Sequence, residues 1–172
     1  MAAKKAKKKQ SIRNSEYYNT QKRFDQLYQD SLHGKRFTQL MDIITTEENI
    51  MLAYRSIKKN KGSKTKGTNN STIVQMGEKT PDELISYVRK RLKNFHPHAV
   101  RRVEIPKPDG RLRPLGIPTI EDRIIQQCIK QVLEPICEAR FYKHSYGFRP
   151  NRSAHHAVAR AMFLVNIGKF RY

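Results

Sequence analysis

Apolar side chains recur every three or four residues along much of the chain, the spacing that places them on one face of an α-helix. Within residues 11–40 this spacing predicts one amphipathic helix, which Gly34 is expected to end. A second helix is predicted from Thr45, which precedes Glu48 by the three residues typical of a capping box. The apolar positions of the two helices are Phe24, Leu27, Tyr28 and Leu32, then Ile50, Met51, Tyr54 and Ile57.

A polar segment follows at residues 60–72, with three lysines, two glycines and no apolar side chain. It is predicted to be a loop. A flexible surface connection and a phosphate-contacting loop are both consistent with it, since Gly62 and Gly67 would allow a close backbone approach. The next helix begins at Thr80, where Pro81 suits the first turn and Glu83 completes a capping box. It must stop before Pro97.

Two extended runs between residues 101 and 119 predict a β-hairpin. Thr119 then caps a helix with a broad apolar face, expected to be the most buried in the chain and to be ended or kinked by Pro135. A turn-rich segment leads to a last helix, capped by Ser153, with a face of small and apolar residues. The predicted fold is α+β, with four or five helices and a hairpin that could join a small antiparallel sheet.

Turn chemistry gives the hairpin its register. The sequence KPDG at residues 107–110 fits a type I turn followed by a left-handed glycine, which makes a three-residue hairpin loop. Lys107 then lies opposite Arg111, and Ile105 opposite Arg113, so the three cations share one face. A two-residue Asp-Gly loop would instead separate Lys107 from Arg113. Like charges on opposite strands repel by up to about 1 kcal/mol. Either this face binds a polyanion that relieves the repulsion, or the three long side chains point apart into water.

Charge sets the class of partner. The 172 residues contain 35 Lys and Arg against 15 Asp and Glu, a net charge of +20, with a pI near 10.2. Such an excess favours nucleic acid as the partner, because each phosphate contact releases counterions; an anionic membrane surface is the lesser alternative. No apolar run approaches the roughly 18 residues of a membrane span, and no secretory signal is recognisable.

Cysteine usage bears on the compartment. Cys128 and Cys137 form no CxxC pair, which indicates reduced, buried thiols in an intracellular protein. We therefore expect a bacterial-type cytoplasmic location, with an organelle as the alternative.

A second candidate site lies at residues 145–153, where two aromatic residues alternate with two arginines. Aromatic faces can stack on bases while arginines hold phosphates. Phe148 is expected to be a core anchor, whereas Arg149 and Arg152 are expected to be ligands. Residues 139–172 contain seven Lys or Arg and no acid, which favours a ligand role for this segment.

These motifs together resemble the fingers region of group II intron-encoded reverse transcriptases, also called intron maturases. The motifs P-K-P-x-G, R-P-L-G-I-P-T, D-R-[I/L]-[I/V]-Q-Q and H-S-Y-G-F-R-P-x-R-S occur in the family's order and spacing. Residues 60–67 match the family's N-K-G-x-x-x-x-G. The resemblance covers residues 45–172 well and residues 1–40 less distinctly, as a basic N-terminal extension. It implies a division into that extension (1–40, partly disordered), a helical region (41–100) and the fingers hairpin with its helices (101–172).

The resemblance implies roles for individual residues. Lys107 and Arg113 match the residues that contact the triphosphate of the incoming dNTP. Template or RNA contacts are implied for Arg101, Lys61, Lys64, Lys66, Leu115, Gly116, Ile117, Pro118, Tyr146, Gly147, Phe148, Arg149 and Arg152. Arg111 has no fixed counterpart. The implied partners are the group II intron RNA and a template–primer duplex, and the implied functions include assistance to intron splicing and mobility.

Family chemistry uses two Mg²⁺ ions held by aspartates. The first of these aspartates follows the family motif that matches residues 168–172, where this chain ends. Glu121 and Asp122 are expected to be helix caps rather than substitutes. We therefore expect no catalytic or metal-binding residue here, and no polymerase activity without the palm and thumb. An apolar surface left uncovered on the last helix would favour self-association. The alternatives are a free-standing RNA-binding module or remnant, and a basic structural protein of a ribonucleoprotein.

Overall fold

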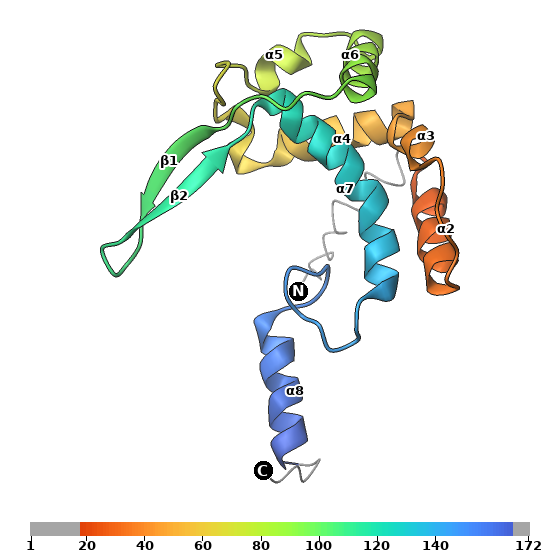
Figure 1. Cartoon of the computed structure of the whole chain (residues 1–172), viewed down its shortest axis with the longest axis vertical. Helices are drawn as coiled ribbons and strands as arrows, with labels where there is room; N and C mark the ends of the chain where they lie inside the picture. The colour runs from red at the N-terminus through yellow and green to blue at the C-terminus, as the bar shows by residue number, and fades with distance from the viewer. Residues whose placement is uncertain (1–17, 167–172) are drawn as a thin grey trace, which may run out of the picture.

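The longest helix of the computed structural model, which describes residues 18–166, runs through the middle of the molecule (Figure 1). This helix, α7 (Ile120–Arg140), follows a two-stranded hairpin and is surrounded by shorter helices. The other elements are α2 (Gln21–Leu32), α3 (Leu40–Ile44), α4 (Glu47–Lys59), the 3-10 helix η1 (Lys61–Lys64), α5 (Ile73–Gly77), α6 (Pro81–Lys93), β1 (Arg101–Pro106), β2 (Leu112–Ile117) and α8 (Ala154–Asn166). The predicted α+β class is confirmed. The partial disorder predicted for residues 1–40 stays a prediction for residues 1–17, which lie outside the described range.

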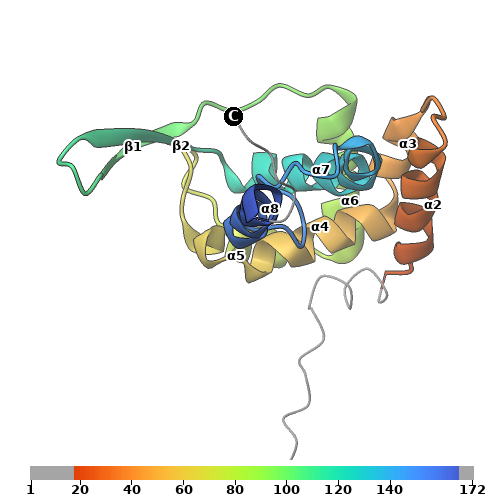
Figure 2. The same ribbon diagram turned by 90° about the horizontal axis from the view of Figure 1, so that it is seen from below.

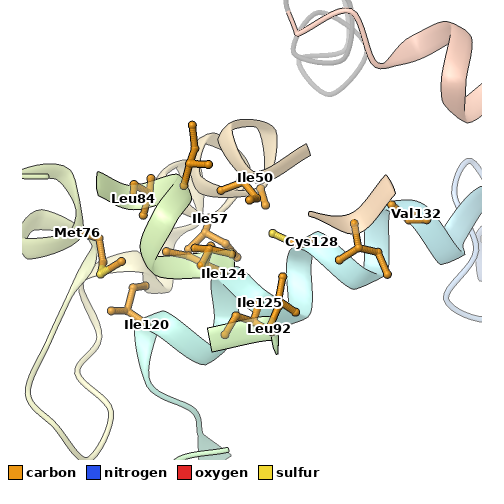
Figure 3. Close-up of a cluster of buried hydrophobic side chains, with 14 of the residues drawn as sticks. Ile50, Ile57, Met76, Leu84, Leu92, Ile120, Ile124, Ile125, Cys128 and Val132 are labelled. Carbon is orange, nitrogen blue, oxygen red and sulfur yellow. The ribbon is translucent and has the colours of Figure 1, made fainter. Parts of the chain in front are cut away.

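The core lies where α4 and α6 pack on the first half of α7 (Figure 3). Its buried side chains are mostly aliphatic and include Leu27, Ile50 and Ile57 of the predicted helical faces. Leu32, also placed on such a face, is 55% exposed. The fully buried members include Ile50, Ile120, Ile124, Ile125 and Val132, together with Cys128. Burying each large aliphatic side chain stabilises the fold by about 1.5–3 kcal/mol. These helices therefore provide a rigid base for the hairpin.

The helix α7 does not end at Pro135, as one reading of the sequence had allowed, but continues to Arg140. An internal proline removes one helical hydrogen bond and costs about 3 kcal/mol. Packing against α2 offsets this cost, because the hydroxyl of Ser31 donates to the carbonyl of Ile136 at 2.7 Å. The guanidinium Nε of Arg140 also donates to the Ser31 hydroxyl at 3.2 Å.

The short helices α3 and α5 and the 3-10 helix η1 were not predicted, and one predicted cap was wrong. Helix α4 is preceded by Thr46 as its N-cap residue rather than by Thr45. The Thr45 hydroxyl instead donates to the carbonyl of Met41 at 2.8 Å and so closes the unpredicted α3. Helix α5 was also missed, although Thr72 and Gln75 form a complete capping box at its start. By contrast, the predicted Thr80–Glu83 capping box of α6 is confirmed, with both of its hydrogen bonds present.

The hairpin has the predicted register, with Ile105 opposite Arg113. The Lys107 amide donates to the Arg111 carbonyl at 2.8 Å, and the Gly110 amide donates to the Lys107 carbonyl at 3.0 Å. Gly110 has a φ of +79°, the left-handed conformation that this three-residue loop requires. Figures 1 and 2 show the hairpin projecting away from the helices, so both of its faces are open to solvent.

The last described helix, α8, stands apart from the other helices (Figure 1). Ser153 caps it as predicted, because its hydroxyl accepts from the His156 amide at 3.4 Å. None of its described residues is buried. Its exposed apolar side chains are Val158, Met162, Phe163 and Val165, so the predicted uncovered apolar surface on this helix is confirmed. No described helix is both long and apolar enough to cross a membrane.

Candidate nucleic-acid interface

The hairpin tip carries three cations in different states. Arg111 is paired with the acid of the turn: its Nε and Nη2 donate to one Asp109 oxygen at 2.9 and 2.7 Å. The bonds from Arg111 lower the pKa of Asp109. By contrast, the side chains of Lys107 and Arg113 make no hydrogen bond or ion pair with another described residue. Lys107 and Arg113 therefore project from one face of the hairpin without a described partner, while Arg111 is paired with Asp109.

The segment from Leu115 to Pro118 connects this face to α7. Leu115 is exposed, and the backbone at Gly116 passes close to Val100, whose Cγ2 would lie 3.1 Å from an added Cβ. The carbonyl of Pro118 accepts from Arg123 Nε at 2.9 Å. The backbone of this segment is thus held at the hairpin base, with the Leu115 side chain available to a ligand.

The basic loop at residues 60–72 is not a flexible connection. Arg123 Nη1 and Nη2 donate to the carbonyls of Gly62 at 2.9 Å and Thr65 at 2.7 Å. Arg101 Nε donates to the carbonyl of Lys66 at 3.0 Å. Burial, and then the nearby charge of Arg101, lowers the pKa of Arg123. The loop is therefore fixed beside the hairpin base, with its lysines Lys61, Lys64 and Lys66 exposed.

Both acids at the start of α7 are occupied by other side chains. The Nδ2 of Asn69 donates to the two carboxylate oxygens of Glu121 at 3.0 Å each. Asp122 is 2% exposed and accepts from Arg91 Nη2 and from the His98 amide, each at 2.7 Å. Glu121 therefore connects the basic loop to α7, and Asp122 connects α7 to the end of α6 and to the segment before β1. Within residues 18–166 no group of three or more His, Cys, Asp or Glu could hold a metal ion.

The segment at residues 141–153 forms a second group at the far end of α7. Arg149 was expected to be a ligand, but its side chain is 6% exposed and is bound to Glu138, with Nη2 2.6 Å from a carboxylate oxygen. Arg149 Nη1 also donates to the carbonyls of Tyr142 at 2.8 Å and Ser145 at 3.0 Å. Arg149 thus has a structural role that sequence reasoning missed, and its template contact stays a prediction.

The expectation that Phe148 is a core anchor is wrong. Its side chain is fully exposed, and its φ of +56° is rare for a bulky residue. The next side chain, Arg149, lies 6% exposed against Glu138. Gly147 is also open, with no atom within 4 Å of where a Cβ would stand. The aromatic face of Phe148 is therefore accessible to a stacking partner.

The segment that carries Phe148 also contains a cluster of rings and cations. His144 lies between Tyr142, whose ring centre is 5.3 Å away, and Tyr146, whose ring centre is 6.5 Å away. The Arg152 guanidinium lies 5.7 Å from the centre of the Tyr146 ring. Partial burial, and then the charges of Arg160, Lys143 and Arg152, lower the pKa of His144. This region is positively charged and aromatic, which suits single-stranded nucleic acid.

The candidate residues thus fall into two groups. The hairpin, Arg101 and the basic loop meet at the start of α7, whereas Tyr146, Gly147, Phe148 and Arg152 follow its end (Figure 1). The second segment turns back along α7, because Pro150 and Asn151 line one pocket with Gln127 and Gln131 near the middle of that helix. Sequence reasoning missed Arg123, although its place in the first turn of α7 within the D-R motif was a usable signal.

Comparisons with known proteins agree with these motifs. The family model for reverse transcriptase (RNA-dependent DNA polymerase) matches residues 105–168. Protein YkfC of Escherichia coli strain K12 is 41% identical over 130 residues, which cover 72% of this chain and 32% of that protein. Group II intron-encoded protein LtrA of Lactococcus lactis subsp. cremoris is 36% identical, covering 71% of this chain and 20% of that protein.

A yeast relative matches the same part of the chain. The putative COX1/OXI3 intron 2 protein of Saccharomyces cerevisiae is 34% identical over 121 residues, covering 70% of this chain and 14% of that protein. The chain therefore spans about a third or less of the length of these relatives.

Proposed function

Because this chain belongs to the reverse transcriptase family of group II intron-encoded proteins, we propose that it binds template RNA and the phosphates of an incoming nucleotide. The hairpin register carries this proposal, because it leaves Lys107 and Arg113 on one face without an internal partner. A guanidinium offers a bidentate fork to phosphate oxygens, and an ammonium offers a mobile point charge. Together these two side chains suit a triphosphate.

We further propose that the template RNA passes the hairpin base. Arg101 and the lysines of the basic loop would hold its phosphates, and Leu115 to Pro118 would lie beside the templating base. The second group, with Tyr146, Phe148 and Arg152, would stack on bases and bind phosphates of the nucleic acid beyond the hairpin. The family and the net charge of +20 support RNA as the polymer.

We propose that intron RNA is one of the RNAs bound, and that the protein assists intron splicing and mobility. The similarity to group II intron-encoded protein LtrA supports this part. Two-metal polymerases use Mg²⁺ to clamp the attacking and leaving oxygens. Glu121 and Asp122 do not fit such a site, because they are engaged by Asn69, Arg91 and His98. No step through the metal is therefore assigned to these residues.

Titration of a fluorescent deoxynucleoside triphosphate into this chain tests the nucleotide site. Lys107→Gln and Arg113→Gln should each weaken binding about tenfold, as expected for a lost charge-assisted hydrogen bond. Arg102→Gln is the matched control: it removes one charge from the same hairpin, but its side chain points to the other face. It should change affinity less than about twofold.

An RNA-binding titration over a salt series completes the test. We expect log K to fall linearly with log salt, as phosphate contacts require. Strong RNA binding without triphosphate binding would overturn the nucleotide site and favour a non-catalytic RNA-binding module. Binding that does not respond to salt would overturn the phosphate-based proposal altogether.

A further inference from the structure

The basic loop at residues 60–72 has no apolar side chain with which to pack. Its position beside the hairpin base therefore depends on polar contacts. Arg123 supplies three of them: its guanidinium donates to Pro118, Gly62 and Thr65 carbonyls at 2.9, 2.9 and 2.7 Å. The last two acceptors belong to the loop, and the first belongs to the segment that leaves the hairpin.

The guanidinium thus ties together segments that are about 60 residues apart in sequence. Further contacts surround it. Gly67 packs so closely on the start of α7 that an added Cβ would lie 2.7 Å from Thr119 Cα. The hydroxyl of Thr68 donates to the Ala99 carbonyl at 3.0 Å, just before β1 begins. Loop, hairpin base and helix start therefore form one unit around Arg123.

The position of Arg123 is electrostatically unfavourable for its positive charge. It lies near Arg101, and both guanidinium groups are held by carbonyl oxygens of the same loop. Burial and the nearby positive charge of Arg101 lower the pKa of Arg123. A lysine could not replace this arrangement, because three carbonyls in different directions match the planar fork of a guanidinium. The three carbonyls, rather than an acid, are the main partners of this side chain.

We propose that Arg123 is a positioning residue that locks the basic loop to the hairpin base. Lys61, Lys64 and Lys66 then form one phosphate-binding surface with Arg101 and the hairpin. The part that concerns phosphate rests on the proposed function above. The part that concerns the loop position stands on the contacts of Arg123 alone. The two parts are therefore tested separately.

Limited trypsin digestion tests the loop position without any RNA. Cleavage after Lys61, Lys64 and Lys66 should be about tenfold or more faster in Arg123→Gln than in the unaltered chain, because protease access follows local opening. Cleavage after Lys90, which is exposed on α6, should change less than about twofold. Arg102→Gln is the charge-matched control and should leave all four rates unchanged.

Two further variants keep the test decisive if Arg123→Gln does not fold. Arg123→Lys retains the charge but loses the fork, and should also speed loop cleavage. Gly67→Ala keeps every arginine but forces the loop away from Thr119, and should give the same pattern. If cleavage in the loop and cleavage after Lys90 in α6 became faster by the same factor in these variants, the cause would be a general loss of stability. That result would overturn the positioning role.

RNA titration over a salt series tests the shared phosphate surface. Arg123→Gln should reduce the slope of log K against log salt by about two or more. The substitution removes one charge, and it also releases the loop lysines from their positions beside the hairpin base. Arg102→Gln should reduce it by about one or less. Equal reductions in the two variants would overturn the shared surface. If the unaltered chain shows no salt-dependent RNA binding, the proposed function fails, while the digestion still decides the role of Arg123.

Discussion

Arg149 holds Glu138 through two nitrogens: Nε lies 3.1 and 3.0 Å from the two carboxylate oxygens, and Nη2 lies 2.6 Å from one of them. Helix α7 contributes the acid and the following loop contributes the base. The same guanidinium binds two carbonyls of that loop. The pair therefore fixes the loop after α7, which also carries the exposed Phe148.

The Arg149–Glu138 pair should couple strongly in a double-mutant cycle. Arg149→Gln and Glu138→Gln each leave a poorly exposed partner unpaired, so each should destabilise the fold by about 2–3 kcal/mol. Together they should show a coupling energy on the order of 2 kcal/mol in urea unfolding. The exposed pair of Lys130 and Glu134, 3.6 Å apart, is the control and should couple by no more than about 0.5 kcal/mol. Additive effects in the first cycle would contradict this account.

Gly110 should matter for the hairpin through backbone conformation alone. Its φ is +79°, and nothing lies within 4 Å of an added Cβ. Gly110→Ala therefore adds strain of about 1–2 kcal/mol without a clash. Because an isolated hairpin is marginally stable, triphosphate affinity should fall about fivefold in a fluorescence titration. Gly110→Asn, which tolerates the left-handed conformation, should retain most of the affinity; an equal loss would point to another cause.

Asn49 should be a major determinant of stability. Its side chain is 1% exposed, and its Nδ2 donates to the Ile44 and Cys128 carbonyls at 2.9 and 3.0 Å. Gln131 Nε2 in turn donates to its Oδ1 at 2.6 Å. Asn49→Leu removes all three bonds, although Gln131 Nε2 keeps its bond to the Asn49 backbone carbonyl at 2.6 Å. The loss should cost about 2–4 kcal/mol. Thermal unfolding should shift down by roughly 5–10 °C.

A second variant separates lost hydrogen bonds from poor packing. Asn49→Leu combined with Gln131→Leu removes both ends of the side-chain bond, so it should recover part of the lost stability. A double variant less stable than Asn49→Leu alone would mean that packing, rather than the unpaired groups, dominates.

His144 should titrate below the ordinary histidine range. Partial burial and the charges of Arg160, Lys143 and Arg152 lower its pKa in the folded protein. The unfolded chain then binds the proton more readily, so stability is full above the unfolded pKa near 6.5 and falls as pH drops towards the folded pKa. Titration followed by NMR of the His144 ring should show this lowered pKa. Added single-stranded RNA should raise it, because phosphates offset the cations; an unchanged pKa would contradict nucleic-acid binding beside this ring.

Sequence reasoning succeeded where a structure depends on neighbouring residues. The hairpin register followed from the KPDG turn, and the α6 start followed from Thr80 and Glu83. The unpredicted α3 and α5 are each five residues long, too short for apolar periodicity to be recognised. The Thr45 error arose because that hydroxyl bonds backward to the preceding short helix.

The sequence by itself determined the charge, the helical faces and the hairpin turn, because each depends on composition or on contacts a few residues apart. Only the tertiary structure decided which cations remain available. Arg123 meets Gly62 across 61 residues, and Gln131 meets Asn49 across 82. Arg149 is bound to Glu138 of α7 and to carbonyls of its own loop, whereas Lys107 and Arg113 have no described partner. The sequence does not distinguish an arginine that binds a carbonyl from one that binds a carboxylate or a phosphate. Only the folded backbone brings one of these acceptors within reach of the guanidinium.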